Sequence, residues 1–204
     1  MTSEQTSGTS FGDRLRADFT TVAWVLIPIG IGINLVGRFI VTVLGLPVFL
    51  DTIGTIMVAF LAGPWVAGLA GLLTNLVIGV TLEATSIPFG IVNAAIGIVA
   101  GLMAARGWLK TFPKAVVLTL ALTVTTIITA TPIATYMFGG VQGSGIDFIT
   151  GFFVATGQGI LESVLTSQVI IQPLDKVVAV VVAFLLTKGV PMRYRPPFGR
   201  EALP

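Results

Sequence analysis

The chain has 204 residues, of which 54% are hydrophobic and only 10% are charged, and its formal net charge is +2. Soluble domains usually have about a quarter of their residues charged. A mean hydropathy of +1.00 therefore excludes an ordinary soluble domain and predicts an integral membrane protein. The sequence has no cysteine and no histidine, which excludes disulfides, a Cys/His metal site and a Ser-His-Asp triad. We expect no metal and no cofactor, and the small net charge gives no indication of nucleic-acid binding.

The N-terminal segment is polar and rich in serine, threonine and glycine, and it lacks the apolar core of a signal peptide. This composition predicts a disordered cytoplasmic tail over residues 1–17. A single membrane domain is expected over residues 18–190, and a basic cytoplasmic tail over residues 191–204.

Glycine and proline divide the apolar region into six expected spans, since a helix that crosses a bilayer needs about 20 apolar residues. The first five are expected at residues 19–44, 47–62, 65–81, 88–105 and 113–138, and the sixth ends near Thr187. The stretch 148–187 is too long for one crossing. It is either two spans broken at Gln172-Pro173, or an external segment at about 139–155 followed by one long, kinked helix.

The distribution of basic residues decides between these two interpretations. Lysines and arginines precede the first span, separate the fourth from the fifth and follow the last, at Arg14, Arg16, Arg106, Lys110, Lys114, Lys188, Arg193, Arg195 and Arg200. The opposite-side segments contain Asp51, Glu83 and Asp147 but no lysine or arginine. Because cytoplasmic loops are rich in Lys and Arg, we expect an all-α bundle of six transmembrane helices with both termini cytoplasmic.

Charged residues within the spans are the first candidates for function, because each costs about 2.5–3.5 kcal/mol to insert. Asp175 and Lys176 are expected near mid-membrane. Neighbouring helical residues point about 100° apart, so one can pair with another helix while the other contacts a ligand. The alternative is a buried ion network that fixes helix packing.

Other polar residues each allow a binding and a structural interpretation. Glu162 is either a ligand group or part of a solvated rim. Asp51 and Glu83 are ligand groups or ordinary interfacial acids, with a helix cap as a further alternative for Asp51. Arg38 either extends to the outer interface or neutralises Asp51 or a ligand carboxylate. Asn93, like Asn75, either bonds between helices or contacts a ligand.

Small residues recur at the four-residue spacing that allows close helix approach. The pattern occurs at Ala67-x-x-x-Gly71 and at Gly97-x-x-x-Gly101. The first span carries a further stripe of Gly30, Gly32 and Gly37. Such a stripe packs inside the chain or docks a separate membrane protein.

Several functional classes are disfavoured by what the sequence lacks. A Gly-rich phosphate loop is absent, so we expect any ATP hydrolysis to reside in partner subunits. Channel filter motifs and the related halves of a secondary transporter are also absent. A membrane enzyme would need a clustered acid and base, and Glu162 with Asp175 is a poorly spaced candidate.

Three stretches carry a resemblance to a known family. They are "INLVGRFIVTVLGLPVFLDTIGTIMVAFLAGPWVAGLAGLLTNLVIG", "SIPFGIVNAAIGIVAGLMAARGWL" and "IIQPLDKVVAVVVAFLLTKGVP". In order and spacing, they resemble the substrate-binding S component of energy-coupling factor (ECF) transporters, which are bacterial vitamin importers. The resemblance implies a multi-pass protein of the bacterial plasma membrane, with no enzymatic activity of its own.

The resemblance further implies that a water-soluble vitamin or related solute binds near the outer face, under the loop between the first two spans. The partners would be a transmembrane coupling protein and two cytoplasmic ATPases. The expected binding residues are Arg38, Asp51, Glu83, Asn93, Glu162, Asp175 and Lys176. Docking of the coupling protein is expected at Gly30, Gly32 and Gly37, although the family commonly has Ala-x-x-x-Ala there.

Two questions stay open at this point. The alternative function is a non-transporting membrane sensor or assembly subunit that binds a ligand or a partner. The chemistry of the solute is also undecided, because the outer-side acids suit a cationic or zwitterionic solute whereas Arg38 and Lys176 suit a carboxylate or phosphate.

Overall fold

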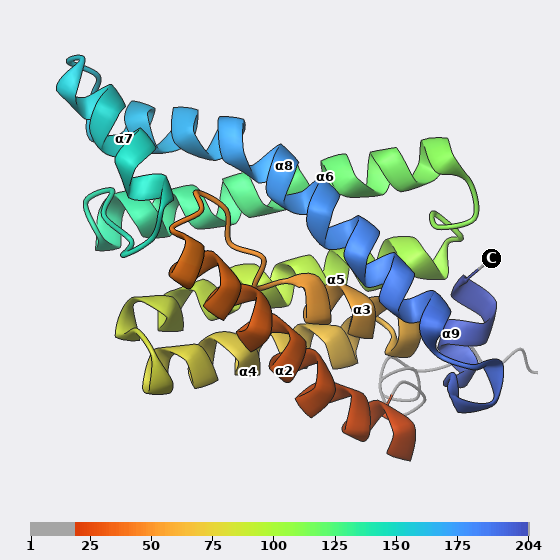
Figure 1. Cartoon of the computed structure of the whole chain (residues 1–204). Helices are drawn as coiled ribbons and strands as arrows, with labels where there is room; N and C mark the ends of the chain where they lie inside the picture. The colour runs from red at the N-terminus through yellow and green to blue at the C-terminus, as the bar shows by residue number, and fades with distance from the viewer. Residues whose placement is uncertain (1–18, 204) are drawn as a thin grey trace, which may run out of the picture.

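The structure is a computed structural model that describes residues 19–203. The tail expected at residues 1–17, together with Arg14 and Arg16, lies outside the described residues. Within the described range all regular secondary structure is helical. Figure 1 shows the helices gathered side by side in one bundle.

The described chain contains five long helices and six short ones. The long ones are α2 (Thr21–Leu44), α4 (Pro64–Thr81), α5 (Gly90–Ala105), α6 (Phe112–Pro132) and α8 (Ile160–Gly189). The short ones are α3 (Ile53–Ala62), η1 (Ala84–Phe89), the π-helical turn η2 (Ile133–Met137), α7 (Ile146–Ala155), η3 (Met192–Tyr194) and α9 (Pro197–Ala202). Five stretches of the described chain are long and apolar enough to cross a membrane, and each contains one long helix. The chain is therefore a multi-pass helical membrane protein.

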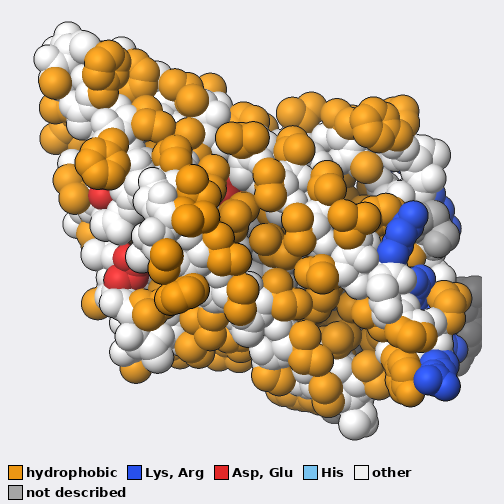
Figure 2. Space-filling model, viewed as in Figure 1, with side chains coloured by type: hydrophobic (Ala, Val, Ile, Leu, Met, Phe, Trp, Pro, Cys, Tyr) orange, Lys and Arg blue, Asp and Glu red, His pale blue; other side chains and the backbone are white. Residues whose placement is uncertain are grey.

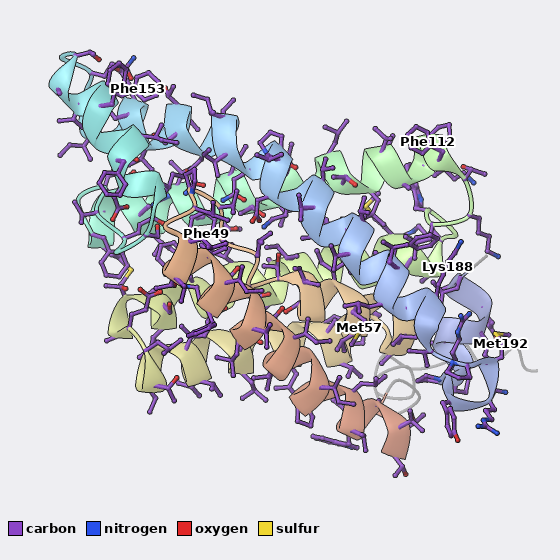
Figure 3. The ribbon with its side chains drawn as sticks, viewed as in Figure 1. Phe49, Met57, Phe112, Phe153, Lys188 and Met192 are labelled. Carbon is purple, nitrogen blue, oxygen red and sulfur yellow. The ribbon has the colours of Figure 1, made fainter. Side chains whose placement is uncertain are left out.

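The second of the six expected spans is replaced by the short helix α3, so six spans are not confirmed. Its ten residues reach only about 15 Å, half the thickness of the hydrocarbon core. Residues 45–52 before it contain turns but no helix. All ten residues of α3 are buried, and Met57 on this helix lies inside the bundle (Figure 3). α3 is thus a central helix, surrounded by protein instead of lipid.

The stretch 148–187 contains one long helix, as the basic residues predicted. α8 runs without interruption through Pro173 for 30 residues, which is about 45 Å. The external segment expected at 139–155 contains α7, which packs against α8. Figure 1 shows α7 and the start of α8 projecting from one end of the bundle, and Phe153 marks this end in Figure 3.

Small residues bring α4 and α5 into close contact, as their spacing predicted. A Cβ atom on Gly71 would lie 2.5 Å from the Asn93 carbonyl oxygen, and one on Gly97 would lie 2.6 Å from the Ala67 carbonyl oxygen. These separations are too short for any side chain larger than hydrogen. The contact holds the end of α4 beside the start of α5, and both of these segments contribute to the cavity described below.

Charged side chains separate to the two ends of the bundle. Lysines and arginines gather at the end that contains α9, whereas the visible carboxylates lie toward the opposite end (Figure 2). Lys188 and Met192 mark the basic end in Figure 3. α2 begins and α8 ends at this same end (Figure 1). The two ends of the bundle therefore differ in their content of exposed basic side chains.

Candidate functional site

A polar cavity lies in the half of the bundle away from the basic end. It contains about 560 Å³ of empty space, counted together with the part that is open to the surroundings. Its wall combines the ends of α2, α4 and α6 with the 45–52 loop, η1, the first half of α5, the middle of α8 and residues 142–144. The lining residues are Arg38, Phe49, Asp51, Thr52, Asn75, Glu83, Thr85, Ser86, Phe89, Val92, Asn93, Ile96, Thr126, Ala130, Gln142, Ser144, Gln168, Gln172 and Lys176.

One face of α8 supplies three polar side chains to this cavity. Gln168, Gln172 and Lys176 are four residues apart, so they stack along a single face of the helix, and all three are buried. Gln172 Nε2 donates a hydrogen bond to Gln168 Oε1 at 2.7 Å. This pairing leaves one donor of Gln168 and one acceptor of Gln172 without protein partners.

The Asp175–Lys176 ion pair fastens the 45–52 loop to α8. Lys176 Nζ donates to Asp175 Oδ2 at 2.6 Å, although the two residues are adjacent. The other carboxylate oxygen, Oδ1, accepts the backbone N–H groups of Phe49 and Leu50, both at 2.9 Å. Lys176 also approaches Thr52 Oγ1 at 3.5 Å. Asp175 therefore lies behind the cavity wall and holds the loop, while Lys176 lines the cavity.

Asp51 and Asn93 form the part of the wall where the loop meets α5. Asn93 Nδ2 donates to Asn75 Oδ1 at 2.8 Å and to the Asp51 backbone carbonyl at 3.2 Å. The first of these bonds is the interhelical contact predicted as one alternative for both asparagines. The carboxylate of Asp51 makes no ion pair and no hydrogen bond with any other residue in the range 19–203, and only the backbone N–H of Asp51 itself interacts with it. It thus lines the cavity without a partner from another described residue.

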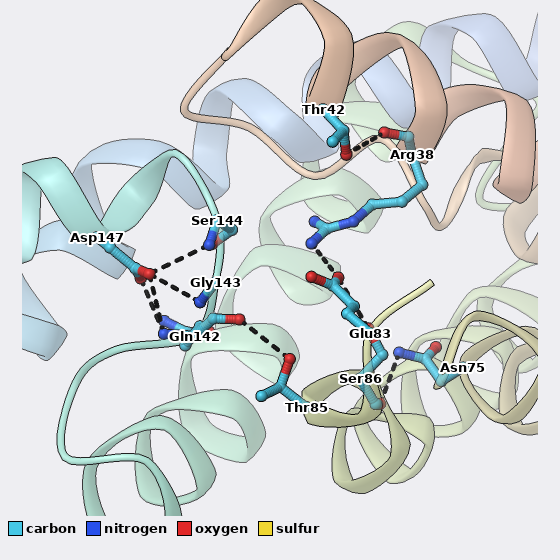
Figure 4. Close-up of polar contacts among 10 residues, drawn as sticks. All are labelled: Arg38, Thr42, Asn75, Glu83, Thr85, Ser86, Gln142, Gly143, Ser144 and Asp147. Atoms are coloured by element: carbon cyan, nitrogen blue, oxygen red, sulfur yellow. Dashed lines mark hydrogen bonds and ion pairs between the residues drawn. The ribbon is translucent and has the colours of Figure 1, made fainter. Parts of the chain in front are cut away.

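Arg38 and Glu83 form a second ion pair at the cavity wall, drawn in Figure 4. The same Glu83 oxygen accepts a hydrogen bond from Ser86 Oγ at 3.1 Å. The guanidinium is buried, with 7% of its side chain exposed, and the carboxylate is 24% exposed. This pair connects the end of α2 to η1, and it leaves Arg38 already neutralised in the absence of any ligand.

Residues 142–144 complete the wall as a loop shaped by Asp147. The Asp147 carboxylate accepts the backbone N–H groups of Gln142, Gly143 and Ser144 at 2.8–3.1 Å (Figure 4). Thr85 Oγ1 donates to the Gln142 carbonyl at 3.3 Å. A second hollow between the end of α2 and residues 143–148 shares Arg38 and Ser144 with the cavity. The loop therefore stands between the cavity and this neighbouring hollow.

Five lining residues carry buried polar atoms that have no partner within the described chain. They are Asn93 Oδ1, Gln142 Nε2, Ser144 Oγ, Gln168 Nε2 and Gln172 Oε1. Leaving a buried polar atom unpaired costs about 1–3 kcal/mol, and native proteins leave few. These atoms converge on one cavity, where water or a bound polar molecule would pair with them.

The structure brings together five of the seven expected binding residues, namely Arg38, Asp51, Glu83, Asn93 and Lys176. Asp175 contacts the cavity through Lys176. Glu162 lies exposed in the first turn of α8 and does not line the cavity.

The glycine stripe of the first span is mostly covered within the chain. Gly30 packs against Val58 and Gly54 of α3, and Gly37 packs against the Leu50 carbonyl. A Cβ on Gly32 would meet nothing within 4 Å, so of the three glycines this one faces open space.

Several lining residues were not expected from the sequence. The four-residue spacing of 168, 172 and 176 was a signal for Gln168 and Gln172, since it places both on the face of Lys176. Phe49, Phe89 and Gln142 had no comparable signal. They reach the cavity because non-helical segments fold back over the bundle, which local patterns do not encode.

The cavity is suited to hydrogen bonding and weak charge complementation more than to metal chemistry. In the part of the chain that the structure describes, no three carboxylates group closely enough to hold a metal ion.

Comparison of the chain with protein-family models, with curated proteins and with solved structures finds no match in any of the three.

Proposed function

We propose that this chain is the substrate-capture subunit of an ATP-driven importer of the energy-coupling factor type. It binds a small water-soluble solute, a vitamin or related compound, in the cavity between α8, α5 and the 45–52 loop. A coupling protein in the membrane and two cytoplasmic ATPases supply the energy. The chain itself performs no chemistry on the solute.

The observation that carries this proposal is the concentration of unpaired polar atoms in an otherwise apolar bundle. Carboxamides of Asn93, Gln168 and Gln172 are buried to 2% exposure or less, yet each keeps a polar atom without a partner in the described chain. A protein that only needed to pack would replace such groups by apolar residues at a gain in stability. Their retention favours a bound polar ligand.

The charge distribution supports binding from outside the cell. The basic end would face the cytoplasm under the rule that Lys and Arg accumulate there, and the cavity lies in the opposite half of the bundle. The neighbouring hollow at Arg38 and Ser144 would then provide the approach from the outer surface. The Asp175 contacts to the loop would close the cavity over its solute.

Docking of the coupling protein is proposed on the exposed side of α2. This side presents apolar side chains such as Val36 and Phe39, which are 59% and 64% exposed. Gly32 lies among them and adds a smooth point, since no described residue in the range 19–203 covers it. Gly30 and Gly37 would contribute indirectly, by holding α3 and the 45–52 loop in place beneath α2.

Mass spectrometry of small molecules released from the purified protein tests the capture function. The full chain is purified in mild detergent from cells grown in rich medium, and then denatured. About one molecule of a single polar compound per chain is expected, since a ligand pocket buries most of the surface of its solute. A monodisperse protein that releases no compound contradicts the proposal and favours a role in sensing or assembly.

Transport is tested separately with the compound so identified. Cells that express the chain with a coupling protein and its ATPases should accumulate the compound. Cells with an ATPase variant that cannot hydrolyse ATP should bind the compound but not accumulate it. Equal accumulation in both strains contradicts ATP-driven import.

A further inference from the structure

We propose that the cavity selects an uncharged or cationic nitrogen heterocycle that carries a hydrogen-bond donor and acceptor side by side, as in a lactam or an aminopyrimidine. This inference rests on the proposed capture function and names the chemical class of its solute. It follows from three features of the cavity. Both cations in its lining are already in ion pairs, Gln168 and Gln172 are hydrogen-bonded to each other, and the Asp51 carboxylate is in no ion pair within residues 19–203.

Both cations at the cavity are already neutralised by protein carboxylates. Arg38 pairs with Glu83, and Lys176 pairs with Asp175 at 2.6 Å. A carboxylate or phosphate ligand would have to displace one of these buried partners, or lie beside it without a free cation. Breaking a buried pair leaves an uncompensated charge, which is strongly unfavourable. The two residues that suggested an anionic solute from the sequence are therefore not free to bind one.

Asp51 is the one acid of the cavity lining that forms no ion pair within the described residues. The two cations are balanced by two other carboxylates, and the Asp51 carboxyl interacts only with its own backbone N–H among residues 19–203. Burial raises the pKa of Asp51, and Arg38, Asp175 and Lys176 act on it only at a distance. A ligand that presents a cationic or N–H group to Asp51 would complete the balance.

The two glutamines of α8 specify the rest of the ligand. Because one N–H group of Gln172 is used on the Gln168 oxygen, the pair retains a donor at Gln168 and an acceptor at Gln172. Reversing both carboxamides would still leave one donor and one acceptor, so this complement does not depend on their orientation. A molecule that offers an acceptor next to a donor satisfies both atoms, as a cis-amide edge does.

The cavity lining contains a second unpaired donor and a second unpaired acceptor. Asn93 keeps an unpaired acceptor and Gln142 keeps an unpaired donor. Phe49 and Phe89 add aromatic surface to the lining, and the Phe89 ring is stacked on Phe138 with its centroid 5.8 Å away. A flat, apolar-faced ring with hydrogen-bonding edges matches this combination better than a flexible chain of hydroxyl groups.

The test compares the compounds retained by three forms of the full chain. In the double variant Gln168→Met/Gln172→Met, both partners of the pair are removed together, so no orphaned carboxamide remains and the fold should be kept. Gln158→Met is the matched control, because Gln158 precedes α8 and does not line the cavity. Size-exclusion profiles and unfolding midpoints of the ligand-free proteins establish that each variant is folded.

The expected result is a nitrogen heterocycle with adjacent donor and acceptor atoms and no net negative charge, released by the wild-type chain and by Gln158→Met. A folded double variant should retain at least about tenfold less of it, as expected when hydrogen bonds worth one decade of affinity are lost. If Gln168→Met/Gln172→Met does not fold, equilibrium binding of cytosine and of benzoate to the wild-type chain, emptied of its compound, decides: cytosine should bind more tightly.

Three results would overturn the inference. The first is an anionic compound, or one without such an edge, which leaves solute capture standing. The second is full retention by the folded double variant. The third is tighter binding of benzoate than of cytosine. An empty wild-type protein instead contradicts the capture function itself, and the inference falls with it.

Discussion

Replacing Asp175 by asparagine should strongly destabilise the protein, and a second substitution should reverse most of the effect. Asp175→Asn keeps one oxygen for the N–H groups of Phe49 and Leu50, each of which donates at 2.9 Å. It removes the negative charge that Lys176 contacts at 2.6 Å. Both side chains are almost completely buried, at 0% and 2% exposure, so the ammonium group would be left uncompensated. Breaking a buried pair in this way costs about 3–5 kcal/mol of unfolding free energy.

Lys176→Met added to Asp175→Asn removes the uncompensated charge at similar side-chain volume. The remaining deficit is the weakening of the two loop hydrogen bonds from charge-assisted to neutral, about 1–2 kcal/mol in total. The double variant should therefore recover about 2–3 kcal/mol relative to Asp175→Asn, a typical coupling energy for residues in direct contact. The assay is equilibrium unfolding in mixed detergent micelles, followed by tryptophan fluorescence.

Glu162→Gln provides the matched control, since Glu162 is an exposed carboxylate on the same helix. Its unfolding free energy should stay within about 0.5 kcal/mol of wild type. The reasoning is refuted if Asp175→Asn loses less than about 1 kcal/mol, or if the double variant is no more stable than the single one. Either result would mean that the ion pair does not hold the 45–52 loop in the folded state.

Three further predictions concern α2, α3 and the cavity. Gly54→Ala should lower the unfolding midpoint, because its Cβ would overlap the Gly30 carbonyl oxygen at a cost of about 1–3 kcal/mol. Gly32→Ala is the control, and it should be neutral or slightly stabilising because its Cβ has open space around it. Equal unfolding midpoints for the two variants would argue against this packing of α2 on α3. Asn34→Leu should lower the unfolding free energy by about 1–3 kcal/mol in the same assay. It removes the oxygen that accepts the Gly54 N–H at 2.6 Å and the amide that donates to the hydroxyls of Thr55 and Thr74. An unchanged unfolding midpoint would contradict this hydrogen-bond network. Asp51→Asn should leave the unfolding midpoint unchanged. It should reduce the retention of a cationic solute, measured by mass spectrometry, about tenfold, because one charge-assisted hydrogen bond to the solute is lost. Equal retention by the variant and the wild type would show that Asp51 does not bind the solute.

The long helices were predictable because changes in local amino-acid composition mark where they begin and end. The first helix was expected at 19–44 and is Thr21–Leu44, and the third was expected at 65–81 and is Pro64–Thr81. In each case an apolar run ends at glycine, proline or polar residues, which are signals that local chemistry provides. The single long helix at the C-terminal end followed from the positions of lysine and arginine.

The short helix α3 could not be predicted from the same evidence. An apolar run over residues 47–62 is compatible with a lipid-facing span and with a helix covered by protein, since both environments favour the same side chains. The difference lies in tertiary contacts. Asp175 accepts the backbone N–H groups of residues 49 and 50, so these residues form a loop instead of the first turns of a helix. The helical part of this stretch is therefore limited to α3.

The candidate site was predictable in its charges and less so in its carboxamides. Asp51 and Lys176 stood out because ionised groups are rare within apolar segments. Gln142 lies in a glycine-rich loop, and since polar residues are common in loops, the sequence gives no signal that it contributes to a site. Its position at the cavity depends on how Asp147 folds that loop, which is a contact that forms only in the assembled structure.

The two ion pairs at the cavity have a consequence for how a membrane voltage acts on this protein. A displacement of one elementary charge through 100 mV involves about 2.3 kcal/mol of electrical work. Arg38 with Glu83 and Lys176 with Asp175 contribute no net charge, so Asp51 is the remaining one at the cavity. A cationic solute beside Asp51 cancels it. If the proposed import moves the site through the membrane field, movement of the loaded site would be electrically silent, whereas return of the empty site with Asp51 ionised would carry one negative charge.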